Sequence, residues 1–337
     1  MVRAGRAPTL ESVAALAGVS RATAGRVLAG STTVGEQARE AVLRAAEELS
    51  YVTNRAARSL MTRRSDSIAF VVGESEERFF SDPHFALVLR GAHNGIAGHD
   101  VQLVFSILGR DADRDRFERF VRGGHLDGVM LLSLHGDDPL PLRLVAAGVP
   151  VVLLGRPFTP IDGLGYVDTD NLGGARSAVD LLVSRGRTRL ATITGPLDMT
   201  AAIDRSAGFE AQVREHGLRP RGAVDGDFSL EGGRAAMRAL LARSPDLDAV
   251  FVANDLMALG ALHELADAGR SVPGDVAVVG FDDSPLAAAA HPAITTVRQP
   301  IVAMGEELGR RLMAGIKQGE PQPPVVLPTE IVLRESA

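Results

Sequence analysis

Two apolar stretches of this sequence are followed directly by polar side chains. Asp282 comes after residues 276–281, and Asn254 comes after residues 249–253. Carboxylate and amide groups accept and donate hydrogen bonds in pairs, which suits the hydroxyl groups of a sugar or polyol. A structural role is the alternative, because an Asp or Asn after a strand often caps the next helix.

Arg205 and Phe228 add the other two components that polyol recognition needs. Arg205, in D-R-S-A-G-F, offers a fork of donors, and Phe228, in G-D-F-S, offers a flat apolar face. Taken alone, an arginine is usually solvated, and a phenylalanine in a chain with 12 Phe and 2 Tyr is usually core. Asp283 is a second candidate carboxylate beside Asp282. The structural alternative for residues 254–255 is that Asp255 caps the next helix and Asn254 only orders the turn.

The sequence lacks the groupings that organise catalysis. It has no cysteine, so thiol nucleophiles, disulfides and thiolate metal sites are excluded. No nucleophile–base pair or metal-ligand spacing is found, and G-L-G-Y at 163–166 is a poor dinucleotide fingerprint. We therefore expect no catalytic residues, no metal and no cofactor.

The N-terminal stretch has the pattern of a helix-turn-helix. Thr9 can cap a first helix on which Val13, Leu16 and Ala17 fall on one inward face. Gly18 suits the left-handed residue that ends this helix. Ser20 can cap a second helix, and a third is expected over 36–50.

The second helix carries the residues that would read DNA. Ala24, Val27 and Leu28 point inward, so the outer face holds the remaining positions. These outer positions are Arg21, Ala22, Gly25 and Arg26. The alternative, a three-helix domain used only for packing, does not require two arginines on an outward face.

Charge is distributed unevenly along the chain. Residues 1–64 carry a net charge of +5, whereas the remainder carries −11, giving −6 for all 337 residues. A basic end on an acidic body indicates one nucleic-acid surface on a soluble protein. Neither a secretory leader nor an apolar run near the ~18 residues of a membrane span is found, so a cytoplasmic protein without membrane contact is expected.

From residue 67 onward, apolar strands alternate with helices. This alternation predicts parallel sheets covered on both faces, and its length predicts two such lobes with a ligand cleft between them. The chain is expected to cross between lobes near Asp168, Thr296 and Val325. Strands are expected at 68–72, 101–105, 128–132, 149–154, 166–168, 190–194, 249–253 and 276–281. Helices are expected at 85–98, 114–123, 172–185, 205–216, 230–244 and 257–268.

Nearly the whole chain resembles the lactose-repressor/galactose-repressor family of bacterial transcription regulators. The resemblance is carried by V-A-A-L-A-G-V-S-R-A-T-A-G-R-V-L from Val13 and by N-R-A-A-R-S-L from Asn54. It implies a short hinge helix whose Leu60 wedges between base pairs of the operator; packing on its own domain is the alternative for Leu60. The DNA-binding residues implied are Thr9, Ser20, Arg21, Ala22, Thr23, Arg26, Asn54, Arg58 and Leu60.

The resemblance also implies an effector site in a fold like that of periplasmic binding proteins. His84 and Phe85, in D-P-H-F, and Gln299, after T-T-V-R, match positions that touch effectors in relatives. Two glycines depart from the family pattern: Gly25 replaces a serine that contacts phosphate, and Gly155 replaces an aspartate that faces the ligand. The effector-binding residues expected are His84, Phe85, Arg205, Phe228, Asn254, Asp282 and Gln299.

The expected architecture is an all-α helix-turn-helix headpiece (1–53), a hinge helix and linker (54–66), and a bilobed α/β effector domain (67–337). Its N-lobe would span about 67–167 and 297–324, and its C-lobe about 168–296 and 325–337. The expected function is effector-controlled repression by a homodimer on a near-palindromic double-stranded DNA operator, with a carbohydrate as effector. The alternatives are a solute-binding module, and a regulator that answers to a purine or other corepressor.

Overall fold

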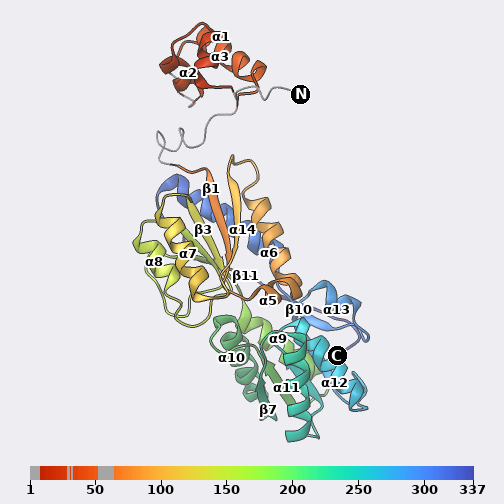
Figure 1. The fold of residues 1–337 in the computed structure, drawn as a ribbon. Coiled ribbons are helices and arrows are strands. Elements are labelled where there is room, and N and C mark those ends of the chain that lie inside the picture. The colour runs from red at the N-terminus through yellow and green to blue at the C-terminus, as the bar shows by residue number, and fades with distance from the viewer. Residues whose placement is uncertain (1–7, 29–30, 32, 52–63) are drawn as a thin grey trace. The chain divides into compact units, whose positions relative to one another are not determined.

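The computed structural model of this chain describes residues 8–28, 31, 33–51 and 64–337. The chain divides into two units, one ending at Asp66 and the other beginning at Ser67. Figure 1 draws the first unit in red and the second from orange to blue. The positions expected to form a hinge helix lie outside the described residues.

Three helices form the first unit: α1 (Leu10–Leu16), α2 (Arg21–Leu28) and α3 (Glu36–Glu48). Thr9 caps α1 through a reciprocal pair of hydrogen bonds with Ser12. Gly18 has a φ of +65°, as the left-handed turn between α1 and α2 requires. All three helices contribute to a small core of Val13, Ala14, Ala24, Val27, Val42 and Ala45.

The inward face expected for α1 was wrong at one position. Leu16 is 48% exposed, while Val13 and Ala14 are buried. The helix is only seven residues long, and Leu16 is its last residue. The helix packs through Val13 and Ala14, so Leu16 lies outside the contact with the other two helices.

The second unit contains two six-stranded sheets. The first has the order β11-β5-β4-β3-β1-β2 and the second β12-β10-β9-β8-β6-β7, and all pairs are parallel except β10 with β12. The first sheet is formed by β1 (Ser67–Val72), β2 (Gln102–Ile107), β3 (Gly128–Leu132), β4 (Val151–Leu154), β5 (Gly165–Thr169) and β11 (Val325–Leu327). The second is formed by β6 (Leu190–Thr194), β7 (Gly222–Asp225), β8 (Ala249–Val252), β9 (Ala277–Asp282), β10 (Thr295–Arg298) and β12 (Glu330–Val332).

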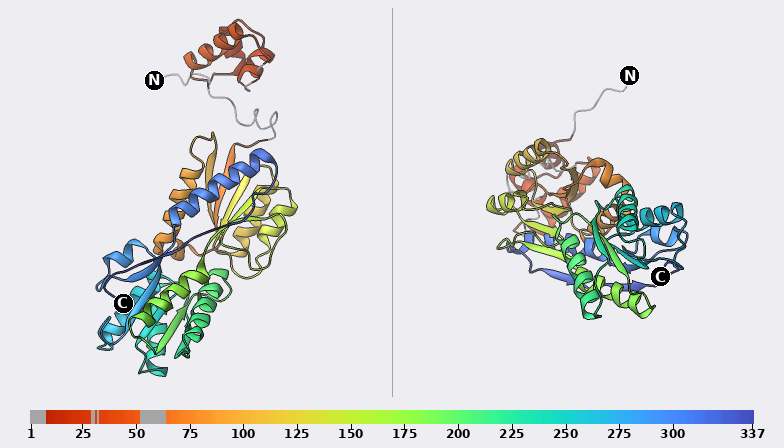
Figure 2. Two further views of the ribbon diagram at one scale, coloured as in Figure 1. Left: turned by 180° about the vertical axis from the view of Figure 1, so that it is seen from behind. Right: turned by 90° about the horizontal axis from the view of Figure 1, so that it is seen from below.

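Helices cover both faces of the N-lobe sheet, as Figure 2 shows from behind and from below. On one face, α6 (Pro83–Gly95) and α14 (Ile301–Gln318) bury a core with strand residues such as Phe70 and Met130. On the other face, α7 (Asp111–Arg122) and α8 (Leu140–Ala146) pack on Val71 and Leu131. The short α5 (Glu76–Ser81) precedes α6.

Helices α6 and α14 touch through their backbones. A Cβ added at Gly91 would lie 2.1 Å from the carbonyl oxygen of Val302, and one added at Gly305 would lie 2.3 Å from that of Val88. Glycine is required at both positions because any side chain would separate the helices.

The C-lobe repeats this three-layer arrangement. Helices α9 (Asn171–Ser184) and α10 (Thr200–Glu215) cover one face of its sheet, with Phe209 and Phe251 in the core between them. Helices α11 (Leu230–Arg243), α12 (Asp255–Asp267) and α13 (Pro285–Ala289) cover the other face. In the described part of the chain, no helix is long and apolar enough to cross a membrane.

The chain passes between the lobes after Thr169, after Arg298 and after Leu327. β11 pairs with β5, so residues 325–327 belong to the N-lobe sheet rather than opening the C-lobe as expected. β10 pairs with β9, so Val297 and Arg298 belong to the C-lobe sheet. Both differences have the same cause. A short strand, β10 or β11, stands just before each crossing and pairs with the sheet of the lobe from which the chain is about to depart.

Candidate ligand cleft and DNA-recognition helix

A cavity of about 660 Å³ lies between the two lobes of the second unit. It is at the carboxyl ends of parallel strands, where α/β folds bind ligands. Its lining includes seven of the candidates from the sequence: His84, Phe85, Arg205, Phe228, Asn254, Asp282 and Gln299. The second candidate carboxylate, Asp283, is not among the lining residues.

Arg205, on α10, is held firmly at the base of this cavity. It is 5% exposed, its Nε donates to Asn171 Oδ1 (2.8 Å), and its Nη1 donates to the Ala253 carbonyl (2.6 Å). The guanidinium stacks 3.7 Å from the centroid of the Phe281 ring. Burial lowers the pKa of Arg205, and the charge of Asp282 opposes that effect. The guanidinium of Arg205 is therefore fixed in position in the cavity wall.

Asp282 ends β9 with a φ of +113°, which is rare for a residue with a side chain. Its Oδ1 accepts a hydrogen bond from Gln299 Nε2 (2.5 Å) and lies 3.6 Å from Arg205 Nη1. Burial raises the pKa of the Asp282 carboxyl, while Arg205 lowers it. The unusual backbone conformation sits at a ligand cavity, where strain of this kind is often found.

Asp283 is also in a left-handed conformation, with a φ of +56°. Its carboxylate accepts hydrogen bonds from Arg298 Nε (2.6 Å) and from Arg334. Although partial burial raises it, these hydrogen bonds hold the pKa of Asp283 below its ordinary value. Asp283 therefore ties the turn to β10 and to the C-terminal segment.

Asp255 is fully buried behind the same turn. One carboxylate oxygen accepts from the Ser284 amide (2.7 Å) and the other from the Thr296 hydroxyl (2.6 Å). Burial and the charge of Asp282 raise the pKa of Asp255 well above its ordinary value. Asp255 is the first residue of α12 and supports the Asp282 turn, so the alternative in which Asp255 caps this helix is wrong.

Asn254 provides that cap. Its Oδ1 accepts from the Met257 amide (2.9 Å) at the start of α12, and its Nδ2 donates to the Phe228 carbonyl (3.1 Å). Asn254 therefore has a structural role as a helix cap and also lines the cavity. Phe228 is 6% exposed, has a φ of +62°, and belongs both to the C-lobe core and to the cavity wall.

The N-lobe faces these residues with the start of α6. Asp82 caps that helix by accepting from the His84 amide (2.9 Å). Arg78, from α5, pairs with Asp82 (3.3 Å) and reaches the C-lobe, where its Nη1 donates to the Asp227 carbonyl (3.1 Å). Its guanidinium lies 5.3 Å from the centroid of the Phe228 ring.

Sequence reasoning missed several cavity residues. Arg78 and Asp82 are not beside the end of a strand, but Asp168 lies near the end of β5 and Asn171 begins the helix after it, much as Asp282 and Asn254 lie at the ends of β9 and β8. Asp168 accepts hydrogen bonds from the Thr169 amide (2.9 Å) and Asn171 Nδ2 (3.1 Å), and burial raises its pKa. The search for polar residues at strand ends would have found Asp168 and Asn171 if it had included D-T-D-N at 168–171.

Charged contacts connect the lobes beside the cavity. His135 lies between Glu74 of the N-lobe (3.2 Å) and Asp198 of the C-lobe (3.0 Å). The hydrogen bond to Glu74, partly offset by burial, raises the pKa of His135 to about 9, with Asp198 adding to the increase. Arg156 Nη2 pairs with Asp204 across the same gap (2.6 Å). The two lobes are therefore in contact beside the cavity through these charged side chains.

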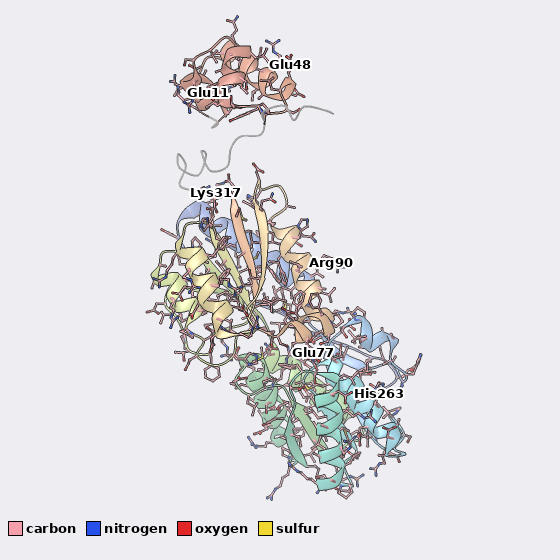
Figure 3. All side chains as sticks on the ribbon, in the orientation of Figure 1. Glu11, Glu48, Glu77, Arg90, His263 and Lys317 are labelled. Carbon is pink, nitrogen blue, oxygen red and sulfur yellow. The ribbon has the colours of Figure 1, made fainter. Side chains whose placement is uncertain are left out.

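On α2, three of the four positions predicted for the outer face are exposed, and the fourth, Gly25, is half-buried. Arg21, Ala22 and Arg26 are exposed, and Arg21 pairs with Glu11 (3.0 Å), a residue labelled on α1 in Figure 3. An exposed pair of this kind costs little to break. Ser20 caps α2 by accepting from the Thr23 amide (3.1 Å). Asn54, Arg58 and Leu60 lie outside the described residues.

Comparison with known protein families gives two matches. Residues 9–54 match the family described as bacterial regulatory proteins, lacI family. Residues 179–337 match a periplasmic binding protein-like domain. The first match covers all three helices of the N-terminal unit, and the second covers most of the C-lobe.

Individual proteins resemble the chain over almost its full length. The HTH-type transcriptional regulator CelR of Thermobifida fusca is 47% identical over 336 residues, which is 98% of each chain. A solved transcriptional regulator CelR–cellobiose complex is 45% identical with a TM-score of 0.78, over 98% of this chain and 100% of that one. A lac repressor dimer bound to operator and the anti-inducer ONPF is 25% identical with a TM-score of 0.84, over 98% and 99%.

Proposed function

The chain belongs to the lacI family of bacterial regulatory proteins, and from this premise we propose that it is a homodimeric repressor controlled by a β-linked glucose disaccharide. The cavity of about 660 Å³ carries the proposal, because it surrounds buried donors and acceptors with apolar walls. That combination suits a sugar, whose hydroxyls need paired partners and whose ring faces are apolar.

The disaccharide is proposed from similarity and from the chemistry of the site. The CelR regulator solved with cellobiose is similar to this chain over nearly its whole length. In this chain Arg205 offers donors and Asp282 offers an acceptor, and both side chains are nine-tenths or more buried. A neutral polyol meets these groups without bringing a charge into the buried site.

For DNA, we propose that α2 enters the major groove of a near-palindromic operator, with Arg21 and Arg26 as base-reading residues. Thr9 and Ser20 cap their helices, so their hydroxyls lie at helix N-termini, where phosphate groups bind favourably. Asn54, Arg58 and Leu60 remain assigned to the DNA contact by the family pattern alone.

Effector control follows from the position of the cavity between two lobes. A sugar held by Arg205 and Asp282 of the C-lobe and by His84 of the N-lobe favours the arrangement of lobes that offers all three contacts. A ligand that prefers one arrangement changes operator affinity, and operator DNA changes ligand affinity by the same factor. We propose that cellobiose releases the operator.

Calorimetric titration of the full chain with cellobiose, beside operator binding with and without the sugar, tests this function. Saturable cellobiose binding with weakened operator binding is expected. A purine that binds where cellobiose does not would contradict the proposed sugar, and operator binding unaffected by bound cellobiose would contradict effector control. The search for operator sites starts with DNA selection on the full chain.

A further inference from the structure

The cavity has chemically different ends on the two faces of the N-lobe sheet. Its polar end, with His84 and Gln299, is on the face covered by α6 and α14. Its other end is formed on the α8 face by the loops that follow β3 and β4. We call the apolar side chains of this second end the apolar wall: Leu134, Leu142, Pro157, Phe158, Pro160 and Ile161. Polar residues of the same loops, Asp137, Asp138, Thr159 and Asp162, also line this end.

Phe158 is the main side chain of the apolar wall. Phe158 lines the cavity, yet it is 44% exposed, and exposure to water is unfavourable for a large apolar side chain. Leu142, at the start of α8, lines the same cavity and is 56% exposed. Together they leave apolar surface open inside a ligand cavity, which is typical of a surface that a ligand covers.

The loop that carries Phe158 is restrained on both sides. Pro157 and Pro160 fix their own φ angles and so limit the conformations of the loop. Thr159 donates a hydrogen bond to Asp137 within the N-lobe. At the base of the loop, the Arg156 carbonyl accepts from the Thr200 hydroxyl of the C-lobe (2.8 Å). The backbone that carries the aromatic ring is therefore restrained before a ligand arrives, which lowers the entropy cost of binding.

Gly155 separates the polar end from the apolar wall. It follows β4 in the cavity lining with a φ of +87°, and apart from its chain neighbours no described atom lies within 4 Å of the position that its Cβ would occupy. No side chain projects into the cavity at Gly155. A ligand bound at Arg205 and Asp282 therefore has room to extend past Gly155 toward Phe158.

We propose that the apolar wall is a second sugar subsite, in which Phe158 contacts the apolar face of the second ring of a β-linked disaccharide. The hydroxyls of the first ring are bound by Arg205 and Asp282 at the polar end. Phe158 then determines the preference for a disaccharide over a monosaccharide. This inference rests on the proposed function, because it assigns the two rings of the proposed effector to two parts of one cavity.

The test is calorimetric titration of the full chain with cellobiose and with glucose, in the wild type, Phe158→Ala and Phe158→Tyr. Phe158→Ala should weaken cellobiose binding about fivefold to tenfold, the amount expected when an aromatic ring is removed from a binding surface. Glucose affinity should stay unchanged, since glucose occupies the polar end alone. Phe158→Tyr keeps the ring face and should restore cellobiose affinity.

Leu197→Ala is the matched control. Leu197 is 46% exposed on the C-lobe loop after β6 but is not a lining residue of the cavity, so its removal should affect neither sugar. A Phe158→Ala variant with wild-type cellobiose affinity, or with equal losses for both sugars, would overturn the second subsite and leave the proposed function intact. A wild type that binds neither sugar would overturn both.

Discussion

Asp282 and Asp283 are adjacent in the chain, yet their carboxylates bind different partners. Asp282 lines the cavity and accepts from Gln299 (2.5 Å), whereas Asp283 accepts from Arg298 (2.6 Å) and Arg334. Both residues have positive φ angles, so the backbone rotates sharply between them. One carboxylate is thus available to a ligand while the other anchors the turn.

Asp282→Ala should abolish the effector response and leave operator affinity nearly unchanged. The variant leaves ligand hydroxyls unpaired in a buried site, which costs about 1–3 kcal/mol for each neutral hydrogen bond that is removed. Calorimetric titration with cellobiose beside operator binding measures both quantities. Full cellobiose affinity in this variant would show that Asp282 does not bind the ligand.

Asp283→Ala should instead lower stability. Its removal leaves Arg298 and Arg334 without their shared carboxylate, and we expect the free energy of unfolding to fall by about 1–3 kcal/mol. Urea denaturation of the wild type, Asp283→Ala and Asp282→Ala separates the two roles. Unchanged stability together with abolished cellobiose binding would assign Asp283 to the ligand.

Arg21→Ala should reduce specific operator affinity by about 1–3 kcal/mol and relax one symmetric base position, as removal of a bidentate guanine contact predicts. Glu11→Ala is the control, because it removes the exposed partner of Arg21 without removing the guanidinium. Its operator affinity should stay close to that of the wild type. Equal weakening of specific and random DNA by Arg21→Ala would indicate a phosphate contact only.

Gly25→Ala should stabilise the N-terminal unit by about 0.5–1 kcal/mol, because glycine inside a helix is unfavourable. The added Cβ meets Leu10 Cδ2 at 3.7 Å, an ordinary contact. Gly25→Ser should in addition strengthen operator binding through the phosphate contact expected at this position. Thermal unfolding and salt-dependent DNA binding measure the two effects; a destabilised Gly25→Ala variant would contradict the packing seen on α2.

Cellobiose affinity should fall as pH rises through about 9. The pKa of His135 is raised from 6.5 to about 9 between Glu74 and Asp198, so its contribution to stability is complete below pH 6.5 and is lost as pH rises through about 9. Because Asp198 belongs to the other lobe, this deprotonation weakens the contact between lobes. Titrations between pH 7 and 10 should show the fall in the wild type and a flatter profile in His135→Gln.

The sequence was most informative where one physical effect dominates. β1, β3 and β6 were located within a residue, because buried parallel strands are continuous apolar runs. β7 was not predicted, since this short edge strand has intermediate and exposed residues in alternation. α14 was also missed: its inward face uses glycines such as Gly305 and Gly309, which read as helix breakers until α6 is seen against them.

The site residues also fall into those that the sequence could predict and those that it could not. Asp282 and Asn254 could be placed at strand ends from the chain alone, and both line the cavity. The clustering of His135 with Asp198, 63 positions apart, depends on how the lobes meet, and no local pattern records it. Likewise, the separate partners of Asp282 and Asp283 follow from the turn that joins them, which only the three-dimensional structure contains.

The backbone contact between α6 and α14 has a mechanical consequence. Both helices begin beside the cavity, at Pro83 and Ile301, and run back toward the edge where β1 begins at Ser67. At Gly91 and Gly305 no side chain separates them, so little soft material can absorb a displacement. We expect the pair to move as one unit, so that a shift at the cavity end reaches the end of the sheet where β1 begins at Ser67.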